Sequence, residues 1–224
     1  MPSEITLINE DCLPAMRKMK DKQFDLALVD PPYGLKTKNV QYGNLTSGKV
    51  TRRDVQKWKT WNANVPTDEY YEQLFRVSKN QIIWGINYLG KNFGSGRIVW
   101  DKFNTATFSD AEIAYQSFTG GVFMFRFQWN GMIQEDMKHK EKRTHPTQKP
   151  VALYKWILKK YARPGDKILD THGGGCSIAI ACYDLDHDAE IYEIDREYYD
   201  VAVRRIENHK KQGTLNFTEA LNGQ

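Results

Sequence analysis

The chain has 224 residues, of which 40% are hydrophobic, 12% aromatic and 27% charged. This size and balance predict one soluble α/β domain with a sizeable core, and they argue against a disordered chain. A formal net charge of +4 is too small to indicate a nucleic-acid-binding protein by itself. No apolar run approaches the roughly 18 residues that cross a bilayer, and no basic head precedes an apolar stretch at the N-terminus. We therefore expect a cytoplasmic protein without a membrane partner.

Short apolar runs alternate with amphipathic stretches, which predicts a mostly parallel sheet covered by helices on both faces. Strands are expected, in chain order, at Ile5–Ile8, Phe24–Val29, Gln81–Trp84, Arg97–Trp100, Ala111–Gln116, Lys167–Leu169 and Glu190–Ile194. Helices are expected at Leu13–Lys20, Thr67–Val77, Val151–Tyr161, Ser177–Tyr183 and Arg196–Lys211. No internal repeat or low-complexity block divides the chain, so residues 1–224 should form a single domain.

Two segments, 35–65 and 118–143, lack a strong period and are long for connections inside a compact domain, as functional loops often are. Both are basic, so they could flank a phosphate backbone. The candidate DNA-binding residues in them are Lys36, Lys38, Arg52, Arg53, Lys140 and Arg143. Aromatic residues also alternate in the second segment as they would in a strand, and we expect them in the core or on a sheet face rather than stacked on bases. They are Phe123, Phe125, Phe127 and Trp129.

The first chemical motif is Asp30-Pro31-Pro32-Tyr33, directly after the apolar run 24–29. A carboxylate at the carboxyl end of a parallel strand points into the crevice where such sheets bind ligands. The two prolines stiffen the turn and leave its carbonyls free to accept hydrogen bonds. Asp30 and the Pro31 carbonyl could therefore accept the two N–H groups of an amino-substituted base while Tyr33 stacks on its ring.

The second motif begins with the short strand that ends at Asp170 and continues through Gly173-Gly174-Gly175 into an apolar helix. A further strand follows, and Glu193 at its end lies about 20 residues past the loop, where an acid can grip ribose hydroxyls. The loop lacks the full G-x-G-x-x-G pattern that admits a pyrophosphate. These features favour S-adenosylmethionine, which has no phosphate, over NAD.

The third element is Thr144-His145-Pro146-Thr147-Gln148-Lys149-Pro150, which precedes the helix expected at 151–161. Pro150 suits the first turn of a helix, and the donors of Thr147, Gln148 and Lys149 gather at its positive end. This end could receive a carboxylate such as that of a methionine moiety.

All three elements and their order resemble the β-class DNA amino-methyltransferases. In that family a catalytic D-P-P-Y comes first, followed by a variable target-recognition region, H-P-T-Q-K-P and then the cofactor loop, a circular permutation of the usual methyltransferase order. The chain matches this order from Ile5 to about His209. The resemblance implies a Rossmann-like S-adenosylmethionine-dependent methyltransferase fold with a seven-stranded sheet, and a location in the cytoplasm of a bacterium or a phage-infected cell.

The resemblance also implies roles for individual residues. Asp30, Pro31, Pro32 and Tyr33 would form the catalytic turn that binds a flipped base. Asp11 would meet the cofactor adenine, and Glu193 would bind the ribose hydroxyls. The cofactor set implied in this way is Asp11, Cys12, Asp30, His145, Lys149, Asp170, His172, Gly174, Ser177 and Glu193. The substrate would be double-stranded DNA, while a homodimer and a restriction endonuclease partner stay open.

An Asp at the head of the tetrapeptide resembles adenine-N6 enzymes more than cytosine-N4 enzymes, which usually carry Ser. RNA and protein-glutamine methyltransferases have similar tetrapeptides but usually place the cofactor loop first. A departure from the family lies in the loop itself, where Cys176 stands at the position of the last expected glycine. Either Cys176 adopts a positive φ, at about 1 kcal/mol or more of strain, or Gly175 takes over the turn. A catalytically silent DNA-binding or partner-binding subunit on the same fold is the alternative outside enzymes.

The remaining chemistry of the chain excludes two further classes of site. Cys12, Cys176 and Cys182 are odd in number and show no CxxC or Cys/His spacing, so they predict neither a disulfide framework nor a metal site. Buried free thiols are expected instead. No Pro-Cys dipeptide like that of cytosine-C5 enzymes occurs in the chain, and direct in-line methyl transfer needs no covalent cysteine.

Overall fold

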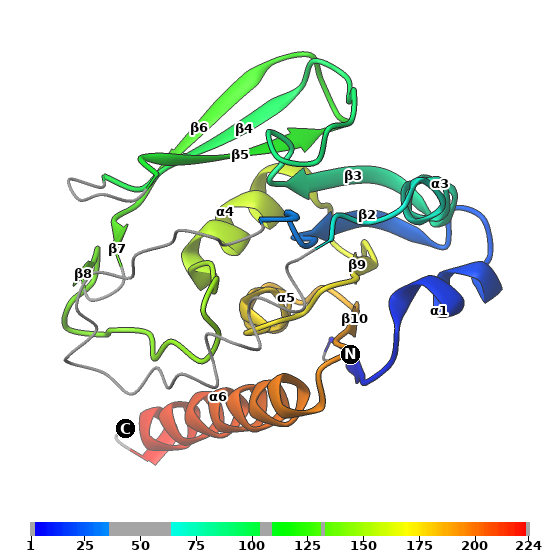
Figure 1. The fold of residues 1–224 in the computed structure, drawn as a ribbon. Coiled ribbons are helices and arrows are strands. Elements are labelled where there is room, and N and C mark those ends of the chain that lie inside the picture. The colour runs from blue at the N-terminus through cyan, green and yellow to red at the C-terminus, as the bar shows by residue number, and fades with distance from the viewer. Residues whose placement is uncertain (1–2, 36–63, 104–108, 131–132, 223–224) are drawn as a thin grey trace.

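The computed structural model describes residues 3–35, 64–103, 109–130 and 133–222. Its strands, in chain order, are β1 (Ile5–Ile8), β2 (Phe24–Val29), β3 (Ser78–Trp84), β4 (Arg97–Asp101), β5 (Ala111–Gln116), β6 (Val122–Arg126), β7 (Trp129–Asn130), β8 (Ile133–Gln134), β9 (Ile168–Asp170) and β10 (Ala189–Tyr192). The main sheet has the order β1-β10-β9-β2-β3-β5-β4-β6 (Figure 1), while β7 and β8 form a small separate sheet.

The main sheet is mostly parallel, as the alternation of apolar runs predicts. Within the described part of the main sheet, β5 alone runs antiparallel to its neighbours, β3 and β4. The expected number of seven strands was wrong, because the main sheet contains an eighth strand, β6, at its edge. This strand contains the first two of the alternating aromatics: Phe125 packs against the core, while Val122 and Met124 on the other face are exposed. Phe127 and Trp129 follow the strand and pack in the core, so the expectation of a core position or a sheet face for these aromatics is confirmed.

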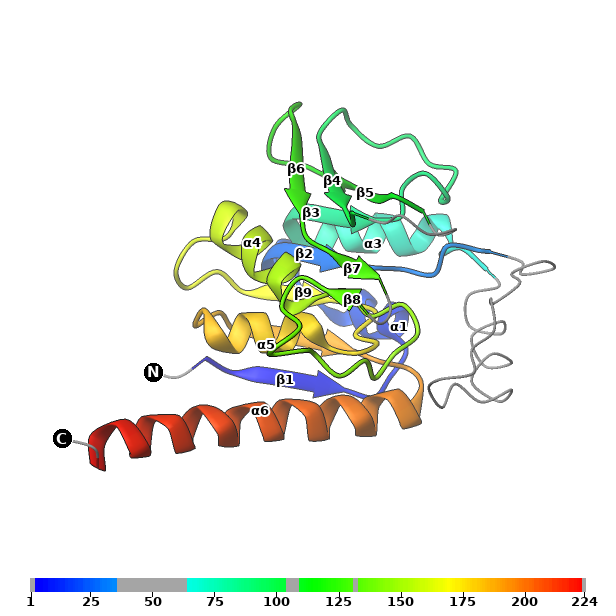
Figure 2. The ribbon, with the colours of Figure 1, turned by 90° about the vertical axis from the view of Figure 1, so that its left-hand side faces the viewer.

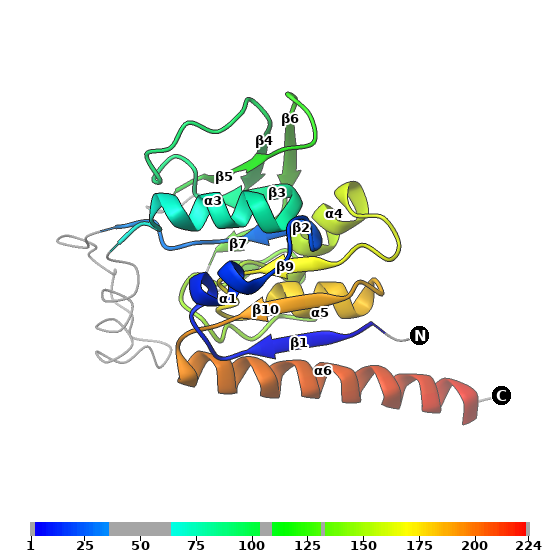
Figure 3. The ribbon, with the colours of Figure 1, turned by 90° about the vertical axis from the view of Figure 1, so that its right-hand side faces the viewer.

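Helices cover both faces of the sheet. They are α1 (Cys12–Lys18), α3 (Asp68–Val77), α4 (Val151–Tyr161), α5 (Ser177–Asp184) and α6 (Arg196–Asn222). Figure 2 views the molecule from the side of α4 and α5, and Figure 3 from the side of α1 and α3. The last helix runs past its expected end at Lys211 and ends at Asn222, although Gly213 within it costs about 1 kcal/mol of helix stability. No described helix has the length and apolar character that a membrane span requires.

The central strand β2 is buried on both faces, which explains its continuous apolar sequence. Leu26 and Leu28 belong to the core between the sheet and α4, α5 and α6. Ala27 and Val29 point the other way, into the core with α1 and α3. Asp30 follows at once, so burial of the strand fixes the position where this carboxylate leaves the sheet.

The connections of the sheet reverse direction between β9 and β2. From β9 the chain passes through α5 to β10, whereas from β2 it passes through α3 to β3 on the other side. These strands are parallel, so their carboxyl ends lie at one edge of the sheet. Asp30, Asp170 and Glu193 lie at the ends of β2, β9 and β10. Such a switch point is where open α/β sheets bind their ligands.

Candidate active site

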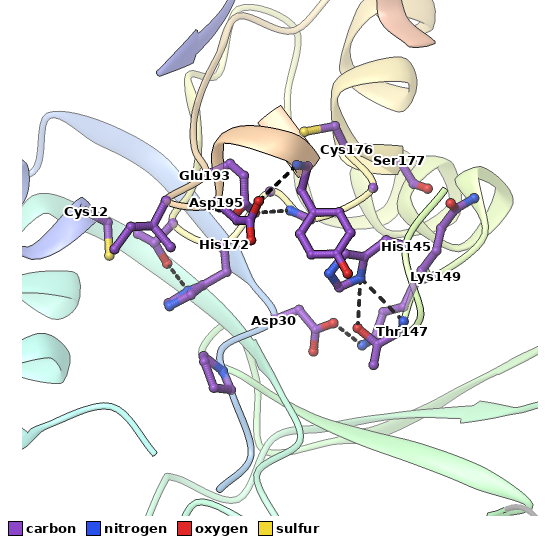
Figure 4. Close-up of a pocket in the computed structure, with 18 of the residues that line it drawn as sticks. Cys12, Asp30, His145, Thr147, Lys149, His172, Cys176, Ser177, Glu193 and Asp195 are labelled. Carbon is purple, nitrogen blue, oxygen red and sulfur yellow. Dashed lines mark hydrogen bonds and ion pairs between the residues drawn. The ribbon is translucent and has the colours of Figure 1, made fainter. Parts of the chain in front are cut away.

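A cavity of about 330 Å³ lies at this edge of the sheet (Figure 4). The predicted site residues that line it are Asp11, Cys12, Asp30, Pro32, His145, Lys149, His172, Gly174, Ser177 and Glu193. The other three lie directly behind it: Pro31 is buried in the turn, Tyr33 bonds to Asp30, and Asp170 is buried beneath the glycine loop. The fold thus brings together all three motifs, which are far apart in the sequence.

Asp30 is held on both oxygens. Its Oδ1 accepts a short hydrogen bond from the Tyr33 hydroxyl, and its Oδ2 lies 2.5 Å from Nζ of Lys149. Figure 4 shows Asp30 and Lys149 pointing toward each other. Lys149 is only 3% exposed, and its Nζ also lies 3.0 Å from Oε2 of Glu112 on β5. Glu112 in turn pairs with Lys102 at 2.5 Å, so two buried carboxylates and two lysines form one chain of charges.

These contacts oppose the effect of burial on the carboxylates. Burial raises the pKa of Asp30, the ammonium of Lys149 counteracts this, and the nearby Glu112 adds to the rise. Burial would also raise the pKa of Glu112, but Lys149 and Lys102 outweigh it and hold that pKa at about 2. Burial lowers the pKa of Lys149, yet the two carboxylates raise it overall, so its ammonium stays charged.

The ring of Tyr33 is held by the segment that directly follows β3. Tyr88 stacks on it, with ring centroids 5.2 Å apart and an angle of 18° between planes. Gly85, at the end of β3, has a φ of +71°, and a Cβ there would lie 2.0 Å from the Tyr33 ring. Tyr88 is 42% exposed, so this stack lies at the surface and not in the core.

The glycine loop shows which residue takes the turn before α5. Cys176 is in the left-handed region with φ 51° and ψ 38°, whereas Gly175 has no positive φ. The strained alternative is therefore the correct one, and the expectation that Gly175 could take over was wrong. Glu193 supports the loop from β10: its carboxylate accepts hydrogen bonds from the backbone N–H groups of Gly174 and Asp195, both at 2.8 Å.

Arg205 of α6 holds the far side of the same loop. Its guanidinium donates to the Gly175 carbonyl and to Oγ of Ser177, the latter at 3.0 Å. It also forms an ion pair, at 3.0 Å, with Glu141 from the second irregular segment, 118–143. The cofactor loop and this segment are therefore joined through one partly buried cation, Arg205.

The amino end of α4 is not free for a ligand carboxylate, as the third motif had suggested. Glu141 already accepts a hydrogen bond from the backbone N–H of Val151 at 2.9 Å. Pro150 is the N-cap residue of this helix. Lys149 turns away from the helix end, toward Asp30. His145 does face the cavity, where its ring lies 4.4 Å from that of Tyr198, and burial lowers its pKa to about 3.

The opposite wall carries the acids and the second histidine. Asp11 caps α1 by accepting the backbone N–H of Leu13 at 3.0 Å, and it stays exposed at the cavity rim. His172 bonds to Thr171 at 2.9 Å, and burial lowers its pKa to about 4. At neutral pH both cavity histidines are thus uncharged donors and acceptors.

Several lining residues were not among the predicted site residues. They are Glu10, Tyr154, Thr171, Ile194, Asp195 and Tyr198. Glu10, Thr171 and Ile194 each adjoin a predicted residue and follow once its position is known. Tyr154 and Tyr198 lie one turn inside α4 and α6, where an aromatic residue at a helical period is usually a core position.

The candidate DNA-binding residues are only partly placed. Lys36, Lys38, Arg52 and Arg53 lie outside the described residues. Lys140 is exposed. Arg143 donates to the carbonyl of Pro146, which turns it toward the third motif.

Solved structures with the same fold are DNA methyltransferases. The cytosine-N4-specific PvuII DNA methyltransferase superposes with a TM-score of 0.60 at 12% identity, covering 95% of this chain and 93% of that one. The M1.HpyAVI–SAM complex gives a TM-score of 0.52 at 19% identity, covering 90% and 99%. At these identities the likeness concerns the fold, and it confirms the Rossmann-like methyltransferase fold.

Sequence comparison leads to the family. The chain is 22% identical to the type II methyltransferase M2.DpnII of Streptococcus pneumoniae over 247 residues, covering 92% of this chain and 90% of that protein. It is 22% identical to M.HinfI of Haemophilus influenzae, covering 92% and 69%. The family of N6/N4-type DNA methylases matches residues 49–204, well over half of the chain. This match, on a fold that joins the three motifs around one cavity, shows that the chain belongs to the DNA methylase family.

Proposed function

We propose that this protein methylates adenine N6 in duplex DNA with S-adenosylmethionine as the methyl donor. The observation that carries the proposal is the position of Asp30, which lies at the end of β2 and faces the same cavity as the glycine loop. An acceptor base at Asp30 and a donor at the loop would therefore meet inside one enclosed space.

The cavity suits a nucleoside with a charged amino-acid tail. Glu193 and Asp11 offer carboxylates for ribose and adenine, and the neutral His145 and His172 offer polar contacts without repelling a cation. No phosphate needs to be accommodated, in keeping with the glycine loop. When bound, S-adenosylmethionine supplies a methyl group activated by its sulfonium.

The residues of the acceptor side align the base and stabilise charge. Asp30 accepts a hydrogen bond from the amino group, which directs the nitrogen lone pair toward the methyl carbon. As the N–C bond forms, the C–S bond breaks with its electrons kept by sulfur, and positive charge develops on the amino nitrogen. The carboxylate stabilises that charge until the nitrogen releases a proton to solvent. The base must first leave the duplex stack, at a cost of a few kcal/mol that stacking on Tyr33 offsets.

The cysteines support direct transfer to nitrogen rather than a covalent route. Burial raises the pKa of Cys12 to about 12 and also raises those of Cys176 and Cys182. Each is therefore a neutral thiol near pH 7, and a thiol is a far weaker nucleophile than a thiolate.

Two alternative functions, a cytosine-N4 methyltransferase and a silent DNA-binding subunit, make different predictions. Cytosine N4 presents the same amino group to Asp30, and what favours adenine is the Asp at this position, where cytosine-N4 enzymes usually carry Ser. A silent DNA-binding subunit would have no need of the donor, so it predicts no binding of S-adenosylmethionine in a titration.

The test is methyl transfer from labelled S-adenosylmethionine to unmethylated duplex DNA, with nucleoside analysis of the product, for the wild type beside Asp30→Ala. N6-methyladenine made only by the wild type is the expected result. N4-methylcytosine would keep the mechanism and overturn the acceptor. The absence of both a methylated product and binding of S-adenosylmethionine would overturn the proposal that the protein is an enzyme, and it would favour the silent subunit.

A further inference from the structure

Lys149 lies on the acceptor side of the cavity, although the motif that contains it suggested the methionine end of the donor. Its Nζ contacts Oδ2 of Asp30 at 2.5 Å, the Tyr33 hydroxyl at 3.2 Å and Oε2 of Glu112 at 3.0 Å. It also lies over the rings of Tyr33 and Trp84, at 5.7 and 5.3 Å from their centroids. None of these groups belongs to the glycine loop.

We propose that Lys149 is a positioning residue for Asp30, that Glu112 holds it in place, and that neither is a ligand of the donor. This inference rests on the proposed function, because it gives Asp30 the acceptor role. It adds two residues to the acceptor site and moves Lys149 from the cofactor set to that site.

The physical reason is the need for a charged carboxylate in a buried place. The developing charge on the amino nitrogen is stabilised by an ionised Asp30, and a protonated Asp30 would lose that effect. An unpaired buried carboxylate takes up a proton instead of staying charged. Lys149 supplies the counter-charge at hydrogen-bonding distance. Each carboxylate oxygen can accept more than one hydrogen bond, so a bound amino group need not displace the lysine.

Glu112 completes the arrangement from β5, which is separated from β2 by β3. Lys149 bridges Asp30 and Glu112, and Lys102 on the outer side of Glu112 brings the four formal charges to zero. A buried lysine with a single partner could follow that partner when a base binds. A second carboxylate on β5 fixes it to the sheet.

The groups that surround Asp30 define what a titration would report. They are Tyr33 from the turn, Glu112 from β5, Lys149 just before the N-cap of α4, Tyr154 on α4 itself and Asp170 from β9. Removing Lys149 takes away the one cation among them and raises the pKa of Asp30. Removing the charge of Glu112 takes away a neighbouring anion and lowers it.

The test is the pH dependence of the single-turnover methylation rate with saturating DNA and donor. Lys149→Met should move the acid limb of the profile upward by about one to three pH units, so that the rate lost near pH 7 returns at higher pH. Glu112→Gln should move the limb downward, and the double variant should fall between the two. Lys155→Met is the matched control, since Lys155 lies on α4 and pairs with Asp184 away from the cavity.

A calorimetric titration with S-adenosylmethionine provides the second readout. We expect the Kd of Lys149→Met to match that of the wild type within about twofold. A Kd weakened tenfold or more, with an unmoved acid limb, would overturn the proposal and show that Lys149 is a ligand of S-adenosylmethionine. An unmoved limb in Glu112→Gln, which preserves the side-chain shape, would overturn it even if Lys149→Met did not fold. An inactive wild type would instead contradict the proposed function, independently of the variants.

Discussion

Gly85 offers the sharpest test of the aromatic part of the site. Its φ is +71°, and an added Cβ would lie 2.0 Å from the Tyr33 ring, far inside van der Waals contact. Gly85→Ala should therefore push that ring by more than about 1 Å, and a misplacement of this size at a reacting centre costs on the order of 100-fold in rate. The positive φ adds about 1 kcal/mol of backbone strain.

Gly90 provides the control because it separates these two effects. Its φ is +62°, and a Cβ there would meet nothing within 4 Å. Gly90→Ala should lose about 1 kcal/mol, or roughly 2–4 °C in Tm, with an unchanged methylation rate. Gly85→Ala should lose at least as much stability together with the large loss of rate. Equal rates in the two variants would refute the view that Gly85 positions Tyr33 for catalysis.

Three further changes test the donor side and the buried charges. Arg205→Met removes the donors that hold the Gly175 carbonyl, so the Kd for S-adenosylmethionine should weaken about tenfold in a titration, the effect of losing about 1.4 kcal/mol. Glu193→Gln keeps the shape of the side chain but weakens its bond to the Gly174 N–H, and it should weaken the same Kd by about tenfold or more while the protein stays folded by circular dichroism. Burial raises the pKa of Asp170 from 3.8 to about 7, so the native state holds a proton that the unfolded chain releases, and the free energy of unfolding should fall as the pH rises from about 4 to 7. Urea denaturation of Asp170→Asn should show a flatter dependence over that range, and an unchanged slope would contradict the assignment.

The sequence contains enough to predict most of the sheet and the place of the catalytic turn. Strands buried on both faces have continuous apolar sequences, and β2 ends where Asp30 begins, so the motif at its end points to the crevice. The eighth strand, β6, was harder to predict, because its alternating aromatics lie in a segment that otherwise reads as irregular. Its pairing with β4 depends on contacts that no local pattern encodes.

The directions of long side chains could not be predicted. Lys149 lies directly before α4, and position alone suggests that its ammonium points to the helix end. The structure instead aligns it with Asp30 and Glu112, because two carboxylates, one at the end of β2 and one on β5, attract it more strongly than a partial dipole charge does. Glu141 then occupies the helix end. Both outcomes depend on residues more than 30 positions apart or on a segment without a regular period.

Cys176 bears on whether the protein is an enzyme or a silent subunit. A non-glycine residue in the left-handed region costs of order 1–3 kcal/mol, and such strain persists only where the surroundings determine the backbone. Here Glu193 binds the loop N–H at Gly174 on one side, and Arg205 binds the carbonyl of Gly175 on the other. The thiol is fully buried, so its packing offsets part of the strain. Contacts from Glu193 after β10 and from Arg205 on α6 hold the loop on both sides, so the donor site keeps its shape despite the missing glycine. We therefore expect a working donor site in this chain.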